Sequence, residues 1–516
     1  MREVRASAWL TLAACVVAGM LNEVSAGVLN LAAPDAARDL GASQATSQLF
    51  LLAGKLSLGA LMLAGGGAGD RFGRKRTMVV GIALVALAAM LSGTARSAGM
   101  LGWARALDGL GNALVSPLAL ALAVMAFPDD MRARIVGLFL GISGLGVAVG
   151  PLLAAFLIEW GGWRVGFLAP LALAVAVGIA IAVLVEPQLS EPRRPPWDPI
   201  GMLLCVAGLV ALVLGFVFTG SRGWTAPATL ALLAIGVVGL AAFGWWETSR
   251  AAIPLLDPAL LRTREVLVAI GAAVVAAMIL NGSVLPLVYF LQRIHGHGPV
   301  ASVLRMLPLV VAAMAMAPAA GALAEGVGRR LVMVSGLLAI AAGSALMVTL
   351  RPDTGYGIIA LSLALIGAGV MTVVTPAADL VMSTSGPERS GSAAALNGAI
   401  MQVGGAIGIG VITSVFLSQA LGGFVARLTA LGYTREQLVG PIGQLREIVR
   451  ETAWNRIPPM PEIDPQMQRD ILDAYAQAFA AGVGRSFLVA MGLALVTALV
   501  VLAGMRGRRA TPAPYP

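Results

Sequence analysis

Arg105 and Asp108 stand three residues apart inside a long apolar run of the sequence, which continues as RALDGLGNALVSP. Side chains three residues apart share one face of a helix. A neighbouring guanidinium favours the charged form of a carboxyl group, whereas burial favours its protonated form. Two interpretations stay open. Either the pair is a permanently neutral structural unit, or Asp108 takes up a proton in one conformation and releases it in another.

Further ionisable residues lie within apolar runs, among them Glu23, Lys55 and Asp379. Charge inside a membrane is costly and usually marks a functional path. Glu23 is therefore a second candidate for carrying a proton. Lys55 could pair with an acid such as Glu23, or repel cationic substrates. Asp379 falls near the end of its run, where we expect it to be hydrated.

The composition is that of a membrane protein. Of the 516 residues 58% are hydrophobic and only 12% are charged, and the mean hydropathy is +0.88. Soluble domains are about half apolar and about a quarter charged. The net charge of +9 comes from short basic clusters between apolar runs, which argues against nucleic-acid binding. Two cysteines and two histidines, all without suitable partners, predict no disulfide framework, no metal site and no cofactor.

Fourteen apolar runs approach the roughly 20 residues that a membrane-spanning helix needs. The expected fold class is an all-α polytopic membrane protein with 14 transmembrane helices. Nineteen Lys or Arg residues fall on one side of the resulting topology, against six in the short loops opposite. The positive-inside rule then puts both termini in the cytoplasm. The expected location of the protein is the inner (plasma) membrane of the cell.

An internal repeat divides the chain. GGAGDRFGRK, beginning at Gly66, returns as GALAEGVGRR at Gly321, 255 residues later. Both copies join two predicted spans on the cytoplasmic side, which indicates a duplicated bundle. We expect a six-helix bundle over 8–186, a linker with two extra helices over 187–265, and a second six-helix bundle over 266–505. The second bundle includes a long external loop, 419–484.

The first copy of the repeat is a candidate gate. Its charges can hold the two halves together on the cytoplasmic side and release them when the packing shifts. The simpler alternative is a basic loop that only sets the topology. The residues assigned to it are Gly66, Asp70, Arg71, Gly73, Arg74 and Lys75.

A second motif, GLGVAVGPLLAA, combines small residues that allow close helix packing with a proline that can bend the helix. Its marker residues are Gly146, Gly150 and Pro151. Ordinary small-residue packing, with no role in direction, is the alternative interpretation.

Taken together, these segments resemble the major facilitator superfamily. GGAGDRFGRK is similar to its signature loop, ARALDGLGNA to its fourth-span motif and GLGVAVGPLLAA to its antiporter motif. The two extra helices resemble those of the fourteen-span drug:proton antiporter family. The resemblance implies two six-helix bundles plus two inserted helices, and places Arg105 at the family's arginine position.

The sequence departs from that family at two positions. Aligned on Asn30 and Pro34, Ser25 stands where the family has an aspartate in the first span. Asp108 stands where the family usually has glutamine. Either the acid has moved, or the proton is carried elsewhere, or transport is not coupled to protons.

The expected function is secondary active export of amphipathic drug-like compounds by proton antiport through alternating access, with no enzymatic activity. Asp108, Glu23 and Arg105 are the expected proton-coupling residues. Export of a lipid or endogenous metabolite is one alternative, and a non-transporting membrane sensor or receptor is another. The expected partners are a small-molecule substrate, protons and the bilayer, and the chain is expected to be a monomer. Candidate residues of the substrate cavity are Asn22, Lys55, Asn281, Asn397 and Gln402.

Overall fold

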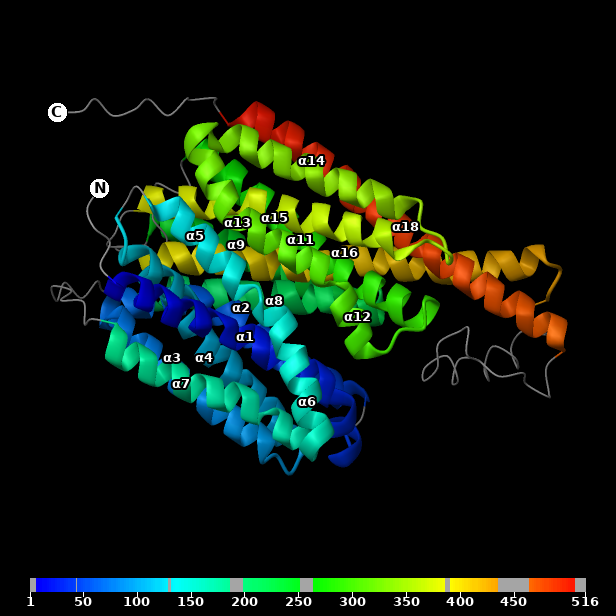
Figure 1. Ribbon diagram of the computed structural model, residues 1–516, viewed down its shortest axis with the longest axis horizontal. Coiled ribbons are helices and arrows are strands. Elements are labelled where there is room, and N and C mark those ends of the chain that lie inside the picture. The colour runs from blue at the N-terminus through cyan, green and yellow to red at the C-terminus, as the bar shows by residue number, and fades with distance from the viewer. Residues whose placement is uncertain are drawn as a thin grey trace.

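The computed structural model describes residues 6–42, 44–128, 131–185, 198–250, 263–385, 390–434 and 464–505, and these are helical with short connections (Figure 1). The first half of the chain forms one bundle. Its helices are α1 (Ala6–Asp39), α2 (Gln44–Phe72), α3 (Arg74–Gly93), α4 (Ala98–Met125), α5 (Arg132–Ser143), α6 (Gly146–Gly166) and α7 (Leu168–Leu184).

The second half forms another bundle. Its helices are α11 (Arg264–Tyr289), a short π-helix (Phe290–Ile294), α12 (Pro299–Arg305), α13 (Leu307–Gly326), α14 (Arg329–Val348), α15 (Tyr356–Ser385), α16 (Ser390–Ala430) and α18 (Pro465–Gly504). Between the halves in sequence, α8 (Pro199–Arg222) and α9 (Pro227–Ser249) form a pair, of which α8 packs against α2 and α16. The start of α1 and the end of α18 lie at the same end of the molecule (Figure 1), which we call the terminal end.

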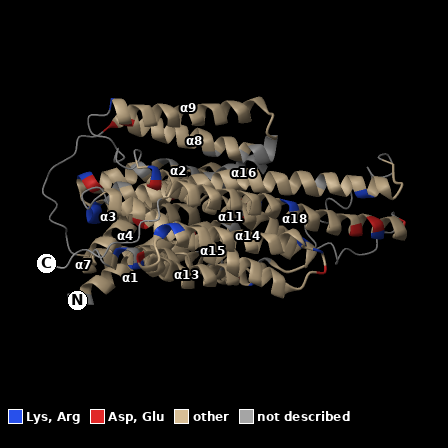
Figure 2. Cartoon of the chain, turned by 90° about the horizontal axis from the view of Figure 1, so that it is seen from above, with Lys and Arg blue, Asp and Glu red and all other residues tan. Residues whose placement is uncertain are grey.

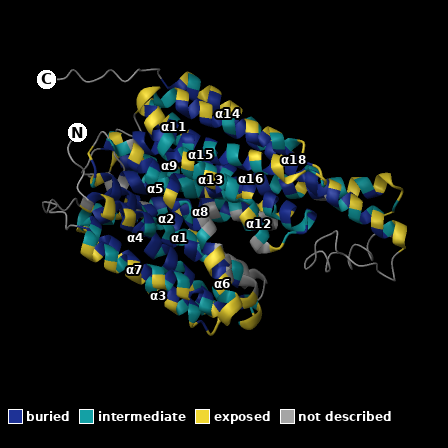
Figure 3. Cartoon of the chain, in the orientation of Figure 1, coloured by how far each residue is buried: buried dark blue, intermediate teal, exposed yellow. Residues whose placement is uncertain are grey.

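The helices suit a lipid environment. Among the described residues, eleven helices are long and apolar enough to cross a membrane, or twelve if the bent pair Phe156–Gly166 and Leu168–Leu184 is one span. Buried residues fill the interior of each bundle (Figure 3). Large apolar side chains such as Val183, Val238 and Leu499 remain 75%, 67% and 65% exposed. Charged side chains lie mainly toward the ends of the helices, and the lengths between them are almost uncharged (Figure 2). The expected all-α fold is thus confirmed.

The duplication is visible in the backbone. Gly73 has φ 94° and directly precedes α3, and Gly328 has φ 101° and directly precedes α14. This left-handed conformation favours glycine, because it lacks a Cβ. The two copies of the loop motif therefore make the same tight entry into a helix, 255 residues apart.

One segment differs from the sequence expectation. The fifth of the predicted spans, near 134–158, is interrupted after Ser143, so that α5 and α6 are separate helices. The predicted external loop 419–484 is helical at both ends, since α16 continues to Ala430 and α18 begins at Pro465. The carboxylate of Asp464 accepts the backbone N–H of Met467 and caps the start of α18.

The extended ends of α16 and α18 pack on each other. Leu428 is buried against Ile471 and Ala474, and the Tyr433 hydroxyl donates to Asp470 at 2.7 Å. That carboxylate raises the pKa of Tyr433. Mutual burial of these apolar side chains stabilises the two described helix ends against each other. Within 419–484 the sequence runs LREIVRETAW and QRDILDAYAQAF are expected to be helical. The second lies in α18. Residues 435–463, which include the first, lie outside the described part of the chain.

The two halves touch through glycines. A Cβ at Gly137 of α5 would lie 2.3 Å from the Ala317 carbonyl oxygen of α13. A Cβ at Gly398 of α16 would lie 2.2 Å from the terminal carbon of Met62 in α2. In addition, α4 contacts α16 and α5 contacts α15, whereas α1 packs on α2, α4, α5, α6 and α7 of its own half. We call the contacts between the two halves, which lie in the part of the bundle toward the terminal end, the terminal-end closure.

Replacing Gly137 with leucine is expected to push the two halves apart at this closure, because no Cβ fits there without a shift of the Ala317 backbone. Overpacking of this kind costs about 1–3 kcal/mol. The measurement is the distance between spin labels at the exposed positions Arg76 and Val327, one in each half. Gly271→Leu is the matched control, because its Cβ would meet nothing within 4 Å. Equal label distances in the two variants would contradict the packing described.

Candidate functional site

A closed set of three polar contacts lies between α1 and α4. The Ser25 hydroxyl donates to Oδ1 of Asp108 at 3.0 Å and accepts from Nη1 of Arg105 at 3.0 Å. Nη2 of Arg105 donates to Oδ2 of Asp108 at 2.9 Å. Ser25, Asp108 and Arg105 are 1%, 2% and 3% exposed. We call these three residues the buried ion-pair site.

This arrangement bears directly on the departure seen in the sequence. Ser25, which stands where an acid was expected, contacts the carboxylate of Asp108 itself. The acid on α4 therefore occupies the α1–α4 contact at the level where a first-span acid would lie. The negative charge is supplied from the facing helix.

Close backbone packing encloses the site. A Cβ at Gly109 of α4 would lie 2.1 Å from the Gly54 carbonyl oxygen of α2, so no larger residue fits. The side-chain amide of Asn112 donates to the backbone carbonyl of Asp108 at 3.0 Å. The glycine contact thus holds α4 against α2, and the amide bond lies within α4 itself. An ion pair kept from water in this way is strengthened by the low local dielectric.

Removing one partner of such a pair leaves an uncompensated buried charge, which costs about 3–5 kcal/mol. The pair is therefore sensitive to any change in the charge of Asp108. Proton uptake is one such change, because it converts the carboxylate to a neutral acid. Protonation of Asp108 can thus change the strength of the α1–α4 contact.

Glu23 faces a different neighbour. Its Oε1 accepts from the side-chain amide of Asn22 at 2.8 Å. A Cβ at Gly146 of α6 would lie 2.8 Å from the Cβ of Glu23, and one at Gly150 would lie 2.8 Å from the Cα of Val24. The glycines of the predicted antiporter motif therefore pack on the turn of α1 that precedes Ser25. Pro151 follows Gly150 within α6.

The predicted gate loop contains a buried ion pair. Arg74 lies 2.9 Å from Oδ1 of Asp70, and the two side chains are 8% and 9% exposed. The same guanidinium also contacts the sulfur of Met125 at the end of α4. The Arg71 guanidinium lies over the ring of Phe72, 5.3 Å from its centre. The loop is thus tied to α4 by Arg74.

Lys75 caps a neighbouring helix. Its ammonium donates to the carbonyl oxygens of Ala182 at 2.8 Å and Val185 at 2.6 Å, at the end of α7. A cation at a helix C-terminus is favoured by the helix dipole. This fixes α3 to α7, a role that the sequence pattern did not reveal.

Two glycines beside Gly66 let α2 approach α4 closely. Gly66 is buried, but a Cβ at Gly65 would lie 2.2 Å from the Ala113 carbonyl oxygen, and one at Gly69 would lie 2.1 Å from Leu118. Both contacts are with α4. The glycine run thus lets α2 lie directly on the helix that carries Arg105.

The expectation that Asp379 is hydrated was wrong. Asp379 is 5% exposed, and its Oδ2 accepts from Nη2 and Nε of Arg329 at 2.6 and 3.1 Å. Arg329 is the repeat counterpart of Arg74, which contacts α4, and Asp379 lies on α15. Sequence reasoning missed this pair, although the 255-residue offset places Asp379 next to the counterpart of Met125.

The predicted cavity residues separate into two groups. Asn397 lines a small cavity of about 120 Å³ between the halves, together with Met62, Pro117 and Met401. The Cβ of Gln402 lies 3.6 Å from the Cβ position of Gly59 across the same interface. These residues face the partner half.

The remaining predicted cavity residues do not line this small cavity. Asn281 donates to its own helix at Ala277, at 3.1 Å, and faces Gly405 within the second half. Asn22 is bonded to Glu23 in the first half. Lys55 is exposed on α2.

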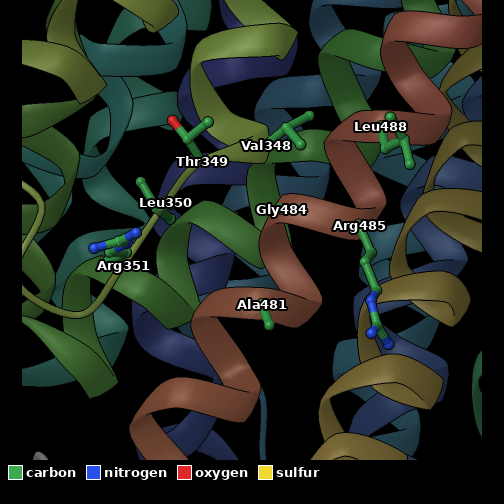
Figure 4. A pocket seen from close by; sticks show the side chains of 8 residues that line it. All are labelled: Val348, Thr349, Leu350, Arg351, Ala481, Gly484, Arg485 and Leu488. Carbon is green, nitrogen blue, oxygen red and sulfur yellow. The ribbon is translucent and has the colours of Figure 1, made fainter.

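A larger, open depression of about 540 Å³ lies at the other end of the bundle (Figure 4). It is formed by the end of α14 with the following turn, Val348–Arg351, and by one face of α18 that includes Gly484 and Arg485. The Arg485 guanidinium donates to the side chain of Gln419. None of the predicted site residues lines this depression.

Comparison with known proteins identifies the architecture. The family description Major Facilitator Superfamily matches residues 15–409. The tetracenomycin C resistance and export protein of Streptomyces glaucescens is 30% identical over 96% of this chain and 92% of its own length. The puromycin resistance protein of Streptomyces alboniger is 36% identical over 79% of this chain and 81% of its own.

Among solved structures, the human organic anion transporter MFSD10 has the same fold, with a TM-score of 0.60 at 15% identity over 97% of this chain and 99% of that one. The family match covers most of the chain, and the sequence relatives with substantial identity are exporters and resistance proteins. The chain belongs to the major facilitator superfamily, as a membrane transporter of its drug- and antibiotic-exporting kind rather than an enzyme.

Proposed function

We propose that the chain exports amphipathic, drug-like compounds in exchange for protons, through alternating access, with both termini in the cytoplasm. Relatives named for tetracenomycin C export and puromycin resistance support the substrate class. The observation that carries proton coupling is the contact of Asp108 with both Ser25 and Arg105. A carboxylate buried in the bundle, with its charge balanced by a neighbour, is the kind of group that proton-driven transporters use.

We also propose that the chain spans the membrane fourteen times. Eleven of the described helices are long and apolar enough to cross a membrane. This set does not include α2, α7 or the α5–α6 pair. α2 is 29 residues long, and α5 and α6 follow each other with only a short break. Counting α2, α7 and the α5–α6 pair as three further spans gives two bundles of six plus α8 and α9.

In the proposed cycle, proton uptake by Asp108 removes the negative charge that Arg105 and Ser25 face. The α1–α4 contact then loses its charge-assisted hydrogen bonds, which are roughly twice as strong as neutral ones. α1 becomes free to shift against α4. Release of the proton restores the pair and the original packing.

A shift of α1 has a physical route to the terminal-end closure. Gly146 and Gly150 let α6 lie on α1 at Glu23 and Val24. α5 precedes α6 in the chain, and Gly137 lies on Ala317 of the other half. With the termini in the cytoplasm, the structure is the form closed on the cytoplasmic side. Movement of α1 would then be passed to α5 and loosen that closure.

The two loop motifs add a charge latch to the same side. Asp70 and Arg74 tie the first loop to α4, and Arg329 ties the second loop to Asp379 of α15. α4 and α5 contact α16 and α15 of the other half. We infer that both pairs stabilise the cytoplasmic-closed state.

Replacing Asp108 with asparagine is expected to abolish pH-gradient-driven efflux, because the amide cannot take up and release a proton. Adding Ser25→Asp to Asp108→Asn is expected to restore much of the efflux. The Ser25 hydroxyl lies 3.0 Å from Oδ1 of Asp108, so an acid at either position belongs to the same site. The measurement is uptake of puromycin and tetracenomycin C into inside-out proteoliposomes with an imposed pH gradient. Thermal unfolding of each purified variant separates loss of coupling from loss of fold.

Full gradient-driven transport in Asp108→Asn would overturn the assignment of Asp108. If Glu23→Gln alone then stopped transport, Glu23 would be the carrier. Failure of Ser25→Asp to rescue a folded Asp108→Asn protein would contradict the view that the acid has moved between facing helices.

The latch predicts additive effects in the two halves. Asp70→Asn and Asp379→Asn each remove one buried charge partner, and each is expected to slow transport about tenfold, with a further loss in the double variant. Initial transport rates measure this. Asp35→Asn is the control, because Asp35 and Arg38 form a pair whose side chains are 49% and 80% exposed. Such exposed pairs contribute about 0–1 kcal/mol. Wild-type rates in both single variants would rule out the latch.

A further inference from the structure

Lys55 is a charged side chain in the middle of a membrane-spanning helix. It is the twelfth residue of α2, which runs Gln44–Phe72. Its neighbour Gly54 packs on the backbone carbonyl of Arg105, so Lys55 lies at the depth of the buried ion-pair site. Yet its own side chain is exposed. An ammonium kept at this depth requires a functional explanation, because charge inside the bilayer is costly.

The helix face that carries Lys55 points toward the other half. Residues 55, 59 and 62 follow the spacing of one helix face. Gly59 faces Gln402 of α16, and Met62 contacts Gly398 of α16. At those two residues the halves touch. Lys55 lies one turn farther from the terminal-end closure, where the same face is exposed rather than covered.

The ammonium has no acid to neutralise it among the described residues. The expected pairing with Glu23 is not formed, since Glu23 accepts from Asn22 and lies on the turn of α1 that faces Gly146. Asp108 is neutralised by Arg105. Among the described residues, the face of α2 that meets α16 at Gly59 and Met62 therefore carries a positive charge with no acidic partner.

We propose that Lys55 binds the carboxylate of anionic amphipathic substrates, so that this exporter prefers acidic compounds to quaternary ammonium compounds. The inference rests on the proposed export function and narrows its substrate class. A compound with an apolar body would lie between the halves, with its carboxylate accepting hydrogen bonds from the ammonium. The same charge would repel a cation of identical shape.

Three probes with one apolar body test this: 4-(1-pyrenyl)butyrate, 4-(1-pyrenyl)butanol and 4-(1-pyrenyl)butyl-trimethylammonium. Binding to the purified full-length protein is measured by energy transfer from its tryptophans to pyrene. We expect the butyrate to bind most tightly. Lys55→Met should weaken butyrate binding about tenfold or more and leave the butanol unchanged, because one charge-assisted hydrogen bond is lost. Lys55→Arg should retain the preference.

Arg351→Met is the matched control, because Arg351 is an exposed cation at the other end of the bundle. Tighter wild-type binding of the trimethylammonium probe, no binding of the butyrate, or equal weakening of all three probes in Lys55→Met would overturn the proposal. Its failure is distinct from failure of export. Suppose that puromycin or tetracenomycin C is transported when a pH gradient is imposed, but the butyrate probe binds no more tightly than the other two. The proposed export function is then supported and the proposed role of Lys55 is rejected.

Discussion

A charge pair buried between two helices is the constraint on which the rest of the molecule depends. Arg105 and Asp108 lie on α4, and Ser25 of α1 completes their hydrogen bonds. Inside a bilayer, neither charge is tolerated without the other. The position of α1 on α4 is therefore tied to the charge of one carboxyl group. A transporter that moves by rearranging packed helices can use such a group as its control point.

In the proposed cycle, glycines would convert that local control into movement of whole halves. Gly54 and Gly109 bring α2 against α4, Gly146 and Gly150 bring α6 against α1, and Gly137 brings α5 against α13. Contacts made by backbone atoms leave no soft side chain to absorb a shift. A displacement of α1 is thus passed to its neighbours instead of being lost.

Much of this organisation follows from the sequence, because it depends on local patterns. Arg105 and Asp108 could be paired from their spacing, and the 255-residue repeat matches Gly73 with Gly328, which the structure shows in the same left-handed conformation. Contacts between helices could not be anticipated, because they depend on rotation and register. The Ser25–Asp108 contact, the burial of Asp379 by Arg329, and the packing of Gly65 and Gly69 on α4 are of this kind. The packing of Leu428 on Ile471, which stabilises the described helix ends of the 419–484 segment, is another contact of this kind.

The most direct test of the central claim is the number of protons released when substrate binds. The purified transporter is mixed with saturating tetracenomycin C in a weakly buffered solution containing a pH indicator. At a pH at which Asp108 is protonated before substrate binds, exchange of its proton for substrate releases about one proton per chain from the wild type, as linkage requires. The Asp108→Asn variant should bind the compound and release none. Equal proton release from the two proteins would contradict the account.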